Sequence, residues 1–447
     1  MPETIVGIAT APGEGGIAIV RLSGPEAIPL FSRVFQGRKP PYPDHLLMHG
    51  YITDAGERLD EVMGVVMRAP ATYTREDVCE IHTHGGYGAA AAVLELLLRL
   101  GAFPAEPGEF TRRAFMNGRI DLVQAEAVMG VISARSAAAL REEERQLMGG
   151  RSGFVRELQQ ELTRLLSGLE AHLDYPEEIS EEEAVADLEG GLRSLEEKLR
   201  RALDERGAHL VQDGLHVALW GLPNAGKSTL FNLLLGEEKA IVTEIPGTTR
   251  DVLEGSFQLN GFRVILEDTA GLRSTGDLVE QLGVERAQTA LRQADAALLV
   301  VDASCPLEQE ALELLAKNPG CPCALLLNKS DQPNALEPEA VENLTALRPI
   351  LSISAREGEG LQGIRSFLDQ QLHLTGEGQL THERHMVLAR SALSRLESAR
   401  ESLAAGQPID LVGIDLHEAL YLLGRITGES VDEKLLDDIF SRFCVGK

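Results

Sequence analysis

The chain has 447 residues, of which 44% are hydrophobic and 25% are charged, a composition typical of a folded globular protein. This length exceeds what one hydrophobic core usually organises, so we expect about two to four domains. No apolar run approaches the ~20 residues that span a bilayer, so we expect no membrane insertion. The net charge of −27 disfavours nucleic-acid binding unless the surface carries a local basic patch.

Two groups of arginines are candidates for such a patch. One is Arg112 and Arg113 together with Arg119, and the other is the spaced arginines between residues 135 and 156. The second group also fits the solvated faces of ordinary helices.

The cysteines and the first residues indicate a cytoplasmic protein. None of the five cysteines has the spacing of a metal site, and Cys321 and Cys323 are too close for a C-x-x-C ligand pair. The segment Met1-Pro-Glu-Thr4 carries an acid where a signal peptide would carry positive charge, so we expect no export signal.

The first predicted domain covers residues 1–118. Short β-like patterns occupy residues 16–21, 61–67 and 77–82, and one apolar helical segment runs from 89 to 100. This mixture predicts an α+β domain.

Helical spacing of Leu, Glu, Arg and Ala then covers residues 119–212 and returns in residues 373–447. Residues 213–372 between them alternate apolar strand-like runs with helical segments, which is the pattern of an α/β domain. The simplest account is one helical domain interrupted by an inserted α/β domain, whose two ends must lie close together.

The inserted region begins with a complete phosphate-binding loop. Gly221-Leu-Pro-Asn-Ala-Gly-Lys-Ser228 follows a predicted strand at 216–220 and precedes a predicted helix at 229–235. In such a loop backbone N–H groups and the helix N-terminus surround phosphate oxygens. Lys227 would reach the β- and γ-phosphates, and the Ser228 hydroxyl would bind Mg²⁺.

Two further motifs select the base. Asn328-Lys-Ser-Asp331 follows the apolar run 324–327, and a carboxylate at Asp331 would accept hydrogen bonds from N1–H and the exocyclic amine of guanine. Ser354-Ala-Arg356 follows the run 350–353 and would supply a backbone contact to guanine O6. Adenine lacks this pair of donors, so the motifs predict GTP.

The hydrolysis motifs lie between these two groups. Asp268-Thr-Ala-Gly271 follows a predicted strand at 263–267, where Asp268 would hold Mg²⁺ through water and Gly271 would contact the γ-phosphate. Thr248-Thr249 occupies the position of switch I, and one of its hydroxyls would complete the Mg²⁺ shell.

A Ras-like GTPase has Gln directly after this D-x-x-G motif, but here that residue is Leu272, which cannot orient water. Another group must hold the water, and another positive charge must replace an arginine finger. The Asn224 oxygen could bind a monovalent cation, although Asn224 also suits a turn for backbone reasons alone. Arg250 could act as a finger or pair with Asp251.

The chain resembles the MnmE/TrmE family of tRNA-modification GTPases. The resemblance rests on motifs over the whole length: Thr4 to Gly16, Gly108-Glu-Phe-Thr111, Gln124-Ala-Glu-Ala127, Gly221 to Thr229, Ile245-Pro-Gly-Thr-Thr-Arg-Asp251, Asp268 to Arg273, and the terminal Phe443-Cys-Val-Gly-Lys447. It implies a multidomain fold that combines α/β and all-α parts. These parts are an N-terminal α+β folate-binding-like domain, a helical domain and an inserted P-loop, Ras-like GTPase domain.

The resemblance also implies the activity and its partners. The family forms homodimers through the N-terminal domain and binds 5-formyltetrahydrofolate or a related tetrahydrofolate there. With a flavoprotein of the MnmG/GidA family it installs an aminomethyl-type (carboxymethylaminomethyl) group at C5 of the wobble uridine of certain tRNAs. GTP hydrolysis in the family needs Mg²⁺, K⁺ and dimerisation of the GTPase domains.

The functional residues that these motifs and the resemblance imply fall into four groups. Catalytic roles fall on Glu280, which would orient water, and on Thr249 and Cys444. Mg²⁺ would contact Ser228 and Thr249, and K⁺ would contact Asn224 and the carbonyls of Thr243, Ile245 and Thr248. The folate contacts would be Arg21, Glu80, Arg119 (often Lys in the family) and Lys447. The nucleotide contacts would be Asn224, Ala225, Gly226, Lys227, Ser228, Thr229, Thr243, Glu244, Ile245, Pro246, Gly247, Thr248, Thr249, Asp268, Thr269, Ala270, Gly271, Asn328, Lys329, Asp331, Ser354, Ala355 and Arg356.

Simpler interpretations of some residues stay open. Glu80 would be a solvent-facing strand residue by alternation alone, and His82 with His84 would be polar loop residues rather than a metal pair. Cys444 could be a small packed hydrophobe. Two other functions also stay open: a GTP-switched ribosome or RNA assembly factor without modification chemistry, and a one-carbon transferase with a regulatory GTPase.

Overall fold

The computed structural model describes residues 3–178, 180–203, 205–237, 253–268, 289–333, 336–372 and 380–446. The chain forms two compact units. Unit 1 consists of Met1–Ile132, Glu144–Leu192 and Ser394–Lys447, and unit 2 consists of Ser133–Glu143 and Arg193–Leu393. Among the described residues, no helix combines the length and the apolar character that crossing a membrane would require.

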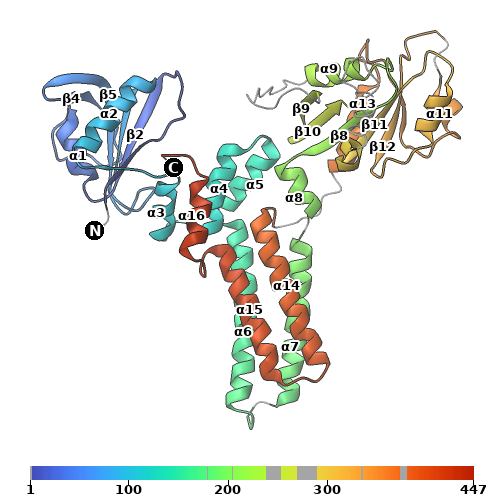
Figure 1. The fold of residues 1–447 in the computed structure, drawn as a ribbon. Coiled ribbons are helices and arrows are strands. Elements are labelled where there is room, and N and C mark those ends of the chain that lie inside the picture. The colour runs from blue at the N-terminus through green and yellow to red at the C-terminus, as the bar shows by residue number, and fades with distance from the viewer. Residues whose placement is uncertain are drawn as a thin grey trace. The chain divides into compact units, whose positions relative to one another are not determined.

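The N-terminal part of unit 1 is built on a seven-stranded sheet with the strand order β3-β4-β5-β6-β2-β1-β7 (Figure 1). All neighbouring strands are antiparallel except β1 and β7. The strands are β1 (Ile5–Ile8), β2 (Ile17–Ser23), β3 (Phe35–Gln36), β4 (Met48–Asp54), β5 (Glu57–Met67), β6 (Val78–His84) and β7 (Phe103–Pro104).

Two helices, α1 (Ala27–Val34) and α2 (Tyr87–Arg99), share one apolar core with these strands. Phe31 of α1 and Val93 and Leu97 of α2 are fully buried, as are Val20 and Ile81 of the sheet. The predicted α+β architecture of this part is therefore confirmed, with α2 close to the predicted helix at 89–100.

The rest of unit 1 is helical and joins distant parts of the sequence. It contains α3 (Glu109–Met116), α4 (Leu122–Ser133), α6 (Gly150–Asp174), α15 (Ile409–Thr427) and α16 (Glu433–Ser441). Helices α6 and α15 lie side by side in Figure 1, and each presents a buried apolar stripe at helical spacing. This packing holds together the two halves of the helical domain.

Unit 2 contains the predicted α/β fold, on a six-stranded sheet with the order β13-β12-β11-β8-β10-β9. Only β9 and β10 are antiparallel. The strands are β8 (Leu215–Trp220), β9 (Leu253–Leu259), β10 (Phe262–Asp268), β11 (Ala296–Asp302), β12 (Cys323–Asn328) and β13 (Ile350–Ser352). The strands predicted at 216–220, 263–267, 324–327 and 350–353 correspond to β8, β10, β12 and β13. Strand β12 is buried along its whole length, as is usual for a central parallel strand.

Apolar cores cover both faces of this sheet. Helices α8 (Glu205–Gln212), α9 (Lys227–Glu237) and α13 (Leu361–Leu372) contribute to one core, and α11 (Gln309–Leu315) and α12 (Pro338–Val341) contribute to the other. Helices on both faces of a mostly parallel sheet form the doubly wound arrangement that the phosphate loop requires.

The β9–β10 hairpin is held at its tip by α5 (Ala137–Leu147). Its turn residues Asn260 and Gly261 have φ values of 51° and 86°, as in a two-residue hairpin turn with left-handed backbone. The Gly261 carbonyl accepts a 2.8 Å hydrogen bond from Ala138 N, and Ser136 Oγ accepts one of 3.0 Å from Ala139 N. The first turn of α5 is thus capped partly by the hairpin.

Two long helices complete the fold: α7 (Glu181–Ala202) and α14 (Glu383–Ala404), each of which contributes to both units. The domain boundaries predicted at 118, 212 and 372 stay predictions, because the two units reflect compactness and each contains parts of more than one predicted domain.

Candidate nucleotide-binding site

The phosphate loop connects β8 to α9 and requires glycine at two positions. Gly221 has a φ of 141°, and a Cβ atom there would lie 2.2 Å from the Val300 carbonyl oxygen. Gly226 has a φ of 97°, and its Cβ would lie 2.1 Å from Asn328 Nδ2. Asn224, with a φ of 62°, is also left-handed, a conformation that Asn tolerates better than most residues. The loop geometry therefore explains the glycine spacing of the motif.

Lys227 is folded over the loop and is 4% exposed. Its Nζ donates hydrogen bonds of 2.8 Å to the carbonyl oxygens of Gly221 and Leu222. Burial lowers the pKa of Lys227, and the nearby Asp268 carboxylate opposes this shift. A phosphate group would supply the negative charge that this buried ammonium lacks.

The two described candidates for Mg²⁺ binding lie together. Ser228 Oγ donates a 3.2 Å hydrogen bond to Asp268 Oδ2, and Asp268 is 1% exposed. Among the described residues, no group of three or more His, Cys, Asp and Glu side chains could hold a metal ion. Hydroxyl, carboxylate and phosphate oxygens suit Mg²⁺, so Ser228 and Asp268 fit a site completed by the nucleotide.

Asn328 connects the guanine motifs to the phosphate loop. Its Nδ2 donates to the Ala225 carbonyl at 2.7 Å, and its Oδ1 accepts from Ala355 N at 2.9 Å. Both ends of this buried amide are satisfied, so it fixes the three loops relative to one another.

Asp331 lies on the same edge of the sheet, where its Oδ1 accepts a 2.7 Å hydrogen bond from Ser354 Oγ. This hydrogen bond is the main cause that holds the pKa of Asp331 below its ordinary value, so the carboxylate stays ionised and can accept from guanine. Arg356, by contrast, is exposed and has Glu357 Oε1 3.6 Å from its Nε.

Asp302, the last residue of β11, was not among the predicted site residues, yet it forms an ion pair with Lys329. Asp302 lies opposite Asn328 in the strand register. The sequence did carry one signal for Asp302, because an acid directly follows the apolar run of β11. Strand β11 pairs with β12, which leads into the Asn-Lys-x-Asp motif.

Twelve selected residues lie outside the described part of the chain, so their predicted roles stay predictions: Thr243, Glu244, Ile245, Pro246, Gly247, Thr248, Thr249, Thr269, Ala270, Gly271, Glu280 and Lys447. The same holds for Arg250, Asp251 and Leu272.

The proposed folate contacts gather in unit 1. Arg21 Nε and Glu80 Oε1 form a 2.8 Å ion pair, and only 17% of each side chain is exposed. The Arg21 guanidinium also lies 5.9 Å from the centre of the Tyr73 ring, and Arg119 lies 4.8 Å from the same centre. Glu80 is therefore not the solvent-facing residue that strand alternation alone predicts. Tyr73 was missed because no local motif marks it.

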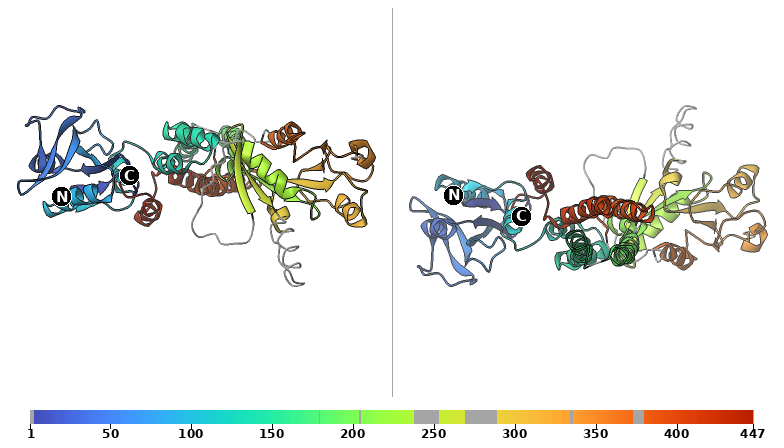
Figure 2. Two further views of the ribbon diagram at one scale, coloured as in Figure 1. Left: turned by 90° about the horizontal axis from the view of Figure 1, so that it is seen from above. Right: turned by 90° about the horizontal axis from the view of Figure 1, so that it is seen from below.

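The C-terminal tail reaches this cluster, and Figures 1 and 2 show the chain end beside the N-terminal domain. Arg21 Nη1 donates a 3.2 Å hydrogen bond to the Gly446 carbonyl, and Gly108 N donates one of 3.3 Å to the Cys444 carbonyl. Phe443 is buried, whereas Cys444 is exposed. Cys444 is thus not a packed hydrophobe.

The two histidines of β6 have acidic partners on the same sheet. His82 Nε2 lies 3.3 Å from Glu80 Oε2, and His84 Nδ1 lies 2.6 Å from Asp60 Oδ1. They are strand residues rather than loop residues, and the described residues do not form a metal site around them.

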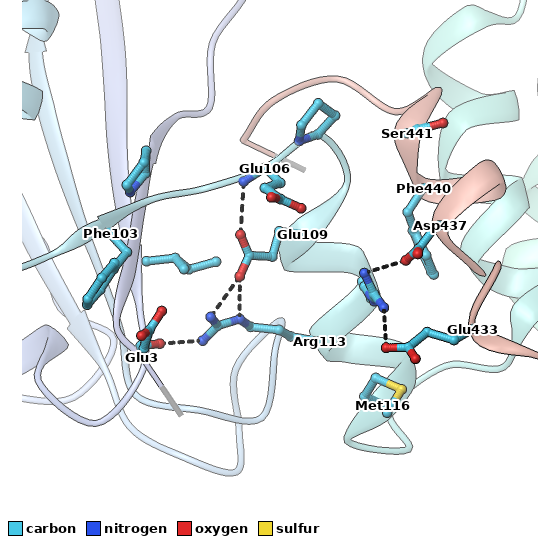
Figure 3. A pocket seen from close by; sticks show the side chains of 14 residues that line it. Glu3, Phe103, Glu106, Glu109, Arg113, Met116, Glu433, Asp437, Phe440 and Ser441 are labelled. Carbon is cyan, nitrogen blue, oxygen red and sulfur yellow. Dashed lines mark hydrogen bonds and ion pairs between the residues drawn. The ribbon is translucent and has the colours of Figure 1, made fainter. Parts of the chain in front are cut away.

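The predicted basic patch at Arg112 and Arg113 is neutralised. Both residues line a cavity of about 830 Å³ between α3, α16 and the edge of the sheet (Figure 3). Arg112 pairs with Asp437 at 2.9 Å, and Arg113 pairs with Glu109 at 2.8 Å and with Glu76 at 3.1 Å. This surface therefore offers little net positive charge to a nucleic acid.

Gly226→Ala tests the loop geometry. The added Cβ would overlap the Asn328 amide, so we expect GDP affinity to fall at least about tenfold. Gly236→Ala is the control, because its Cβ in α9 would meet no atom within 4 Å. Calorimetric GDP titration would contradict the prediction if the Gly226 variant bound as tightly as the Gly236 variant.

Asp331→Asn tests the base contact. The amide of Asn has one acceptor and one donor, whereas the carboxylate of Asp331 accepts from both N1–H and the exocyclic amine of guanine. We therefore expect a shift in preference from GTP toward xanthosine triphosphate. Competition binding with the two nucleotides measures this preference. An unchanged preference would mean that Asp331 does not contact the base.

The chain matches known proteins over its whole length. Residues 4–119 match the family described as GTP-binding protein TrmE N-terminus, and residues 122–444 match the MnmE helical domain. The tRNA modification GTPase MnmE of Listeria welshimeri is 43% identical over 458 residues, which covers 100% of this chain and 99% of the relative. The corresponding protein of Geobacillus kaustophilus is 42% identical over 462 residues, with 100% and 99% covered. Among solved structures, the G domain of the T. maritima FeoB iron transporter is 27% identical, covers 35% of this chain and 98% of that chain, and gives a TM-score of 0.27. The full-length identity to the curated relatives confirms the resemblance found in the sequence, and the chain belongs to the tRNA modification GTPase MnmE family.

Proposed function

We propose that this GTPase couples K⁺-dependent GTP hydrolysis to modification of the wobble uridine of certain tRNAs. The product would be an aminomethyl-type (carboxymethylaminomethyl) group at C5, made with a tetrahydrofolate one-carbon unit and a flavoprotein of the MnmG/GidA family. The observation that carries the proposal is that one chain contains both a built phosphate loop and a cluster of Arg21, Glu80, Tyr73 and Arg119 against its own C-terminal tail.

For hydrolysis, Asn224 is the described residue that would hold K⁺. Its side chain is exposed at the mouth of the loop, and within the described residues no group uses its amide as a hydrogen-bond partner. Its oxygen would be one ligand of K⁺, and the carbonyls of Thr243, Ile245 and Thr248 would complete the site. A cation there supplies the charge stabilisation that an arginine finger supplies elsewhere.

The other catalytic roles follow the resemblance. Ser228 and Thr249 would bind Mg²⁺, which stabilises charge on the phosphates. Glu280 would orient the attacking water in place of the glutamine that Leu272 replaces.

For the one-carbon donor, the residues around Tyr73 have suitable chemistry. Arg21 and Arg119 can bind the carboxylates of a folate glutamate, and the Tyr73 ring offers an aromatic surface to a pterin. Glu80 can accept hydrogen bonds from pterin N–H groups. A cavity of about 470 Å³ is lined by Tyr73 and Arg119, and Lys447 would add a further charge.

The proposed assembly is a homodimer through the N-terminal domain that works with the flavoprotein on tRNA in the cytoplasm. Large apolar side chains on this domain are exposed, including Ile17 at 63% and Tyr87 at 79%, and would suit a subunit interface. All five cysteines are free, which fits a reducing compartment. Because Arg112 and Arg113 are paired, another surface or the partner protein must supply most of the tRNA contact.

Potassium dependence tests the hydrolysis proposal. We expect GTP turnover to be at least about tenfold faster in K⁺ than in Na⁺ at equal ionic strength. Asn224→Gly keeps the left-handed backbone but removes the oxygen, so it should abolish the difference. Asn260→Gly, a left-handed turn residue on the β9–β10 hairpin, is the matched control and should keep K⁺ stimulation. Equal rates of the unaltered protein in the two salts would contradict the proposal.

The chain end tests the modification proposal. Gly446 has a φ of 93°, and a Cβ there would lie 2.3 Å from the Ile8 carbonyl oxygen, so Gly446→Ala should displace the tail. Cys444→Ser removes the exposed thiol. We expect both variants to keep K⁺-stimulated GTP hydrolysis and to lose most of the tRNA modification, measured by mass analysis of nucleosides from a deletion strain that expresses each variant.

Matched controls separate this effect from general damage. Gly406→Ala changes a left-handed glycine with no atom within 4 Å of its Cβ, and Cys305→Ser removes another exposed thiol. Both should restore modification. Normal nucleosides with Gly446→Ala and Cys444→Ser would show that the tail has no part in the chemistry, and normal nucleosides in the deletion strain itself would refute the proposed function.

A further inference from the structure

Asp302 and Lys329 meet at the edge of the sheet where the guanine motifs end. Asp302 is the last residue of β11 and pairs with Asn328, the last residue of the neighbouring strand β12. Ala303 N donates a 2.9 Å hydrogen bond to the Asn328 carbonyl, so the residue after Asp302 is tied directly to the strand that carries the Asn-Lys-Ser-Asp motif.

The Asp302 carboxylate is held in one orientation by its neighbours. Its Oδ1 accepts hydrogen bonds from Ser304 Oγ at 2.6 Å and from Ser304 N at 2.9 Å, which leaves Oδ2 for the ammonium of Lys329. Burial raises the pKa of Asp302, but the hydrogen bonds from Lys329 and Ser304 outweigh this effect and leave the pKa below its ordinary value. The carboxylate is therefore charged near neutral pH, and the pair is a true ion pair.

Lys329 needs such support because of its backbone. Its φ of 69° is left-handed, a conformation that lysine adopts at a cost in free energy. This turn lets Asn328 point inward to the phosphate loop while Asp331, three residues later, contacts Ser354 on the neighbouring loop. Backbone hydrogen bonds from Ser330 N to Ile353 O (3.1 Å) and from Gln332 N to Lys329 O (3.0 Å) hold the turn.

The ion pair also keeps Lys329 away from the carboxylate that receives the base. Asp331 is only two residues from Lys329 and is exposed, so a free ammonium could pair with it. In the described part of the chain, the groups that lower the pKa of Asp331 are Ser354, the Asp331 backbone, Gln332 and Arg356, and Lys329 is not among them.

We propose that Asp302 is a positioning residue for guanine nucleotides, which acts through Lys329. By binding the ammonium it fixes the long side chain of Lys329 before the nucleotide arrives, so that less side-chain freedom is lost on binding. It also leaves Asp331 free to accept from N1–H and the exocyclic amine. Asp302 thus affects the affinity of the protein for the guanine base of the nucleotide. It does not affect the rate at which the γ-phosphate is cleaved. The proposal depends on guanine-nucleotide binding alone and is independent of K⁺, folate and tRNA.

A double-mutant cycle on the full-length protein tests this role, with dissociation of a fluorescent GDP analogue measured by stopped flow. We expect Asp302→Ala and Lys329→Ala each to speed dissociation about tenfold. Because Asp302 acts through Lys329, the double variant should release GDP no faster than the faster single variant. For Asp302→Ala the turnover number at saturating GTP should stay within about twofold of the unaltered protein, while KM rises.

Two further variants keep the result interpretable. Asp302→Asn keeps the shape and the contact with Ser304 but removes the charge, so it should behave like Asp302→Ala even if the alanine variant folds poorly. Ser304→Ala keeps the charge and should have a smaller effect. If Asp302 had only a structural role, its variants would lower the unfolding temperature of the nucleotide-free protein. They would not show this order of GDP release rates or the lack of additivity with Lys329→Ala.

Several outcomes would overturn the proposal. These are GDP release within twofold of the unaltered protein for Asp302→Asn, multiplicative effects in the double variant, or a fall in turnover at saturating GTP with KM unchanged. Failure of the unaltered protein to bind the GDP analogue would instead contradict nucleotide binding itself, so the two failures are distinguishable.

Discussion

The nucleotide site depends on the buried amide of Asn328, which is 2% exposed. Burying an amide costs free energy unless both its donor and its acceptor are used, and here they bind Ala225 O and Ala355 N. The phosphate loop and the two base-recognition loops therefore cannot shift independently. The same amide occupies the space that a side chain at Gly226 would need, and its inward direction requires the left-handed turn at Lys329. One hydrogen-bonded side chain thus accounts for the glycine at position 226 and for the left-handed backbone at Lys329.

A second constraint links the nucleotide unit to the helices. The β9–β10 hairpin ends in Asn260 and Gly261, and the Gly261 carbonyl satisfies one of the N–H groups that the start of α5 cannot satisfy itself. The other end of α5 is held in unit 1, where Gln124 Nε2 donates a 2.9 Å hydrogen bond to the Leu147 carbonyl. The inserted domain is therefore attached through this contact as well as through its chain ends. Any displacement of the hairpin tip acts directly on the first turn of α5.

Much of the fold was predictable because its signals are local. Buried parallel strands are continuous apolar runs, and the phosphate loop is recognisable because its backbone requires glycine at fixed positions. The Asp302–Lys329 pair was not predicted, although Asp302 ends an apolar strand-like run. The Arg119–Tyr73 contact was not predicted because only the folded chain brings these two residues together. The arginines of α3 were a wrong candidate for a basic patch for the same reason. Two of their acidic partners lie on α16, and strand or helix periodicity cannot reveal such a pairing.

The chain end shows how the second site is built. Arginine has several donors in a planar fork, so Arg21 can bind Glu80 through Nε and the Gly446 carbonyl through Nη1 at once. This cluster belongs to unit 1, whereas the phosphate loop belongs to unit 2. Helices whose residues are divided between the two units connect these sites along the chain. Within the described residues these helices are α4, α5, α7 and α14, whose residues are divided between the units at 132/133, 143/144, 192/193 and 393/394. Helix α5 accepts the tip of the β9–β10 hairpin at its first turn, and the second strand of that hairpin ends at Asp268 of the nucleotide site. This helix therefore contacts a strand of the nucleotide site directly and continues into unit 1.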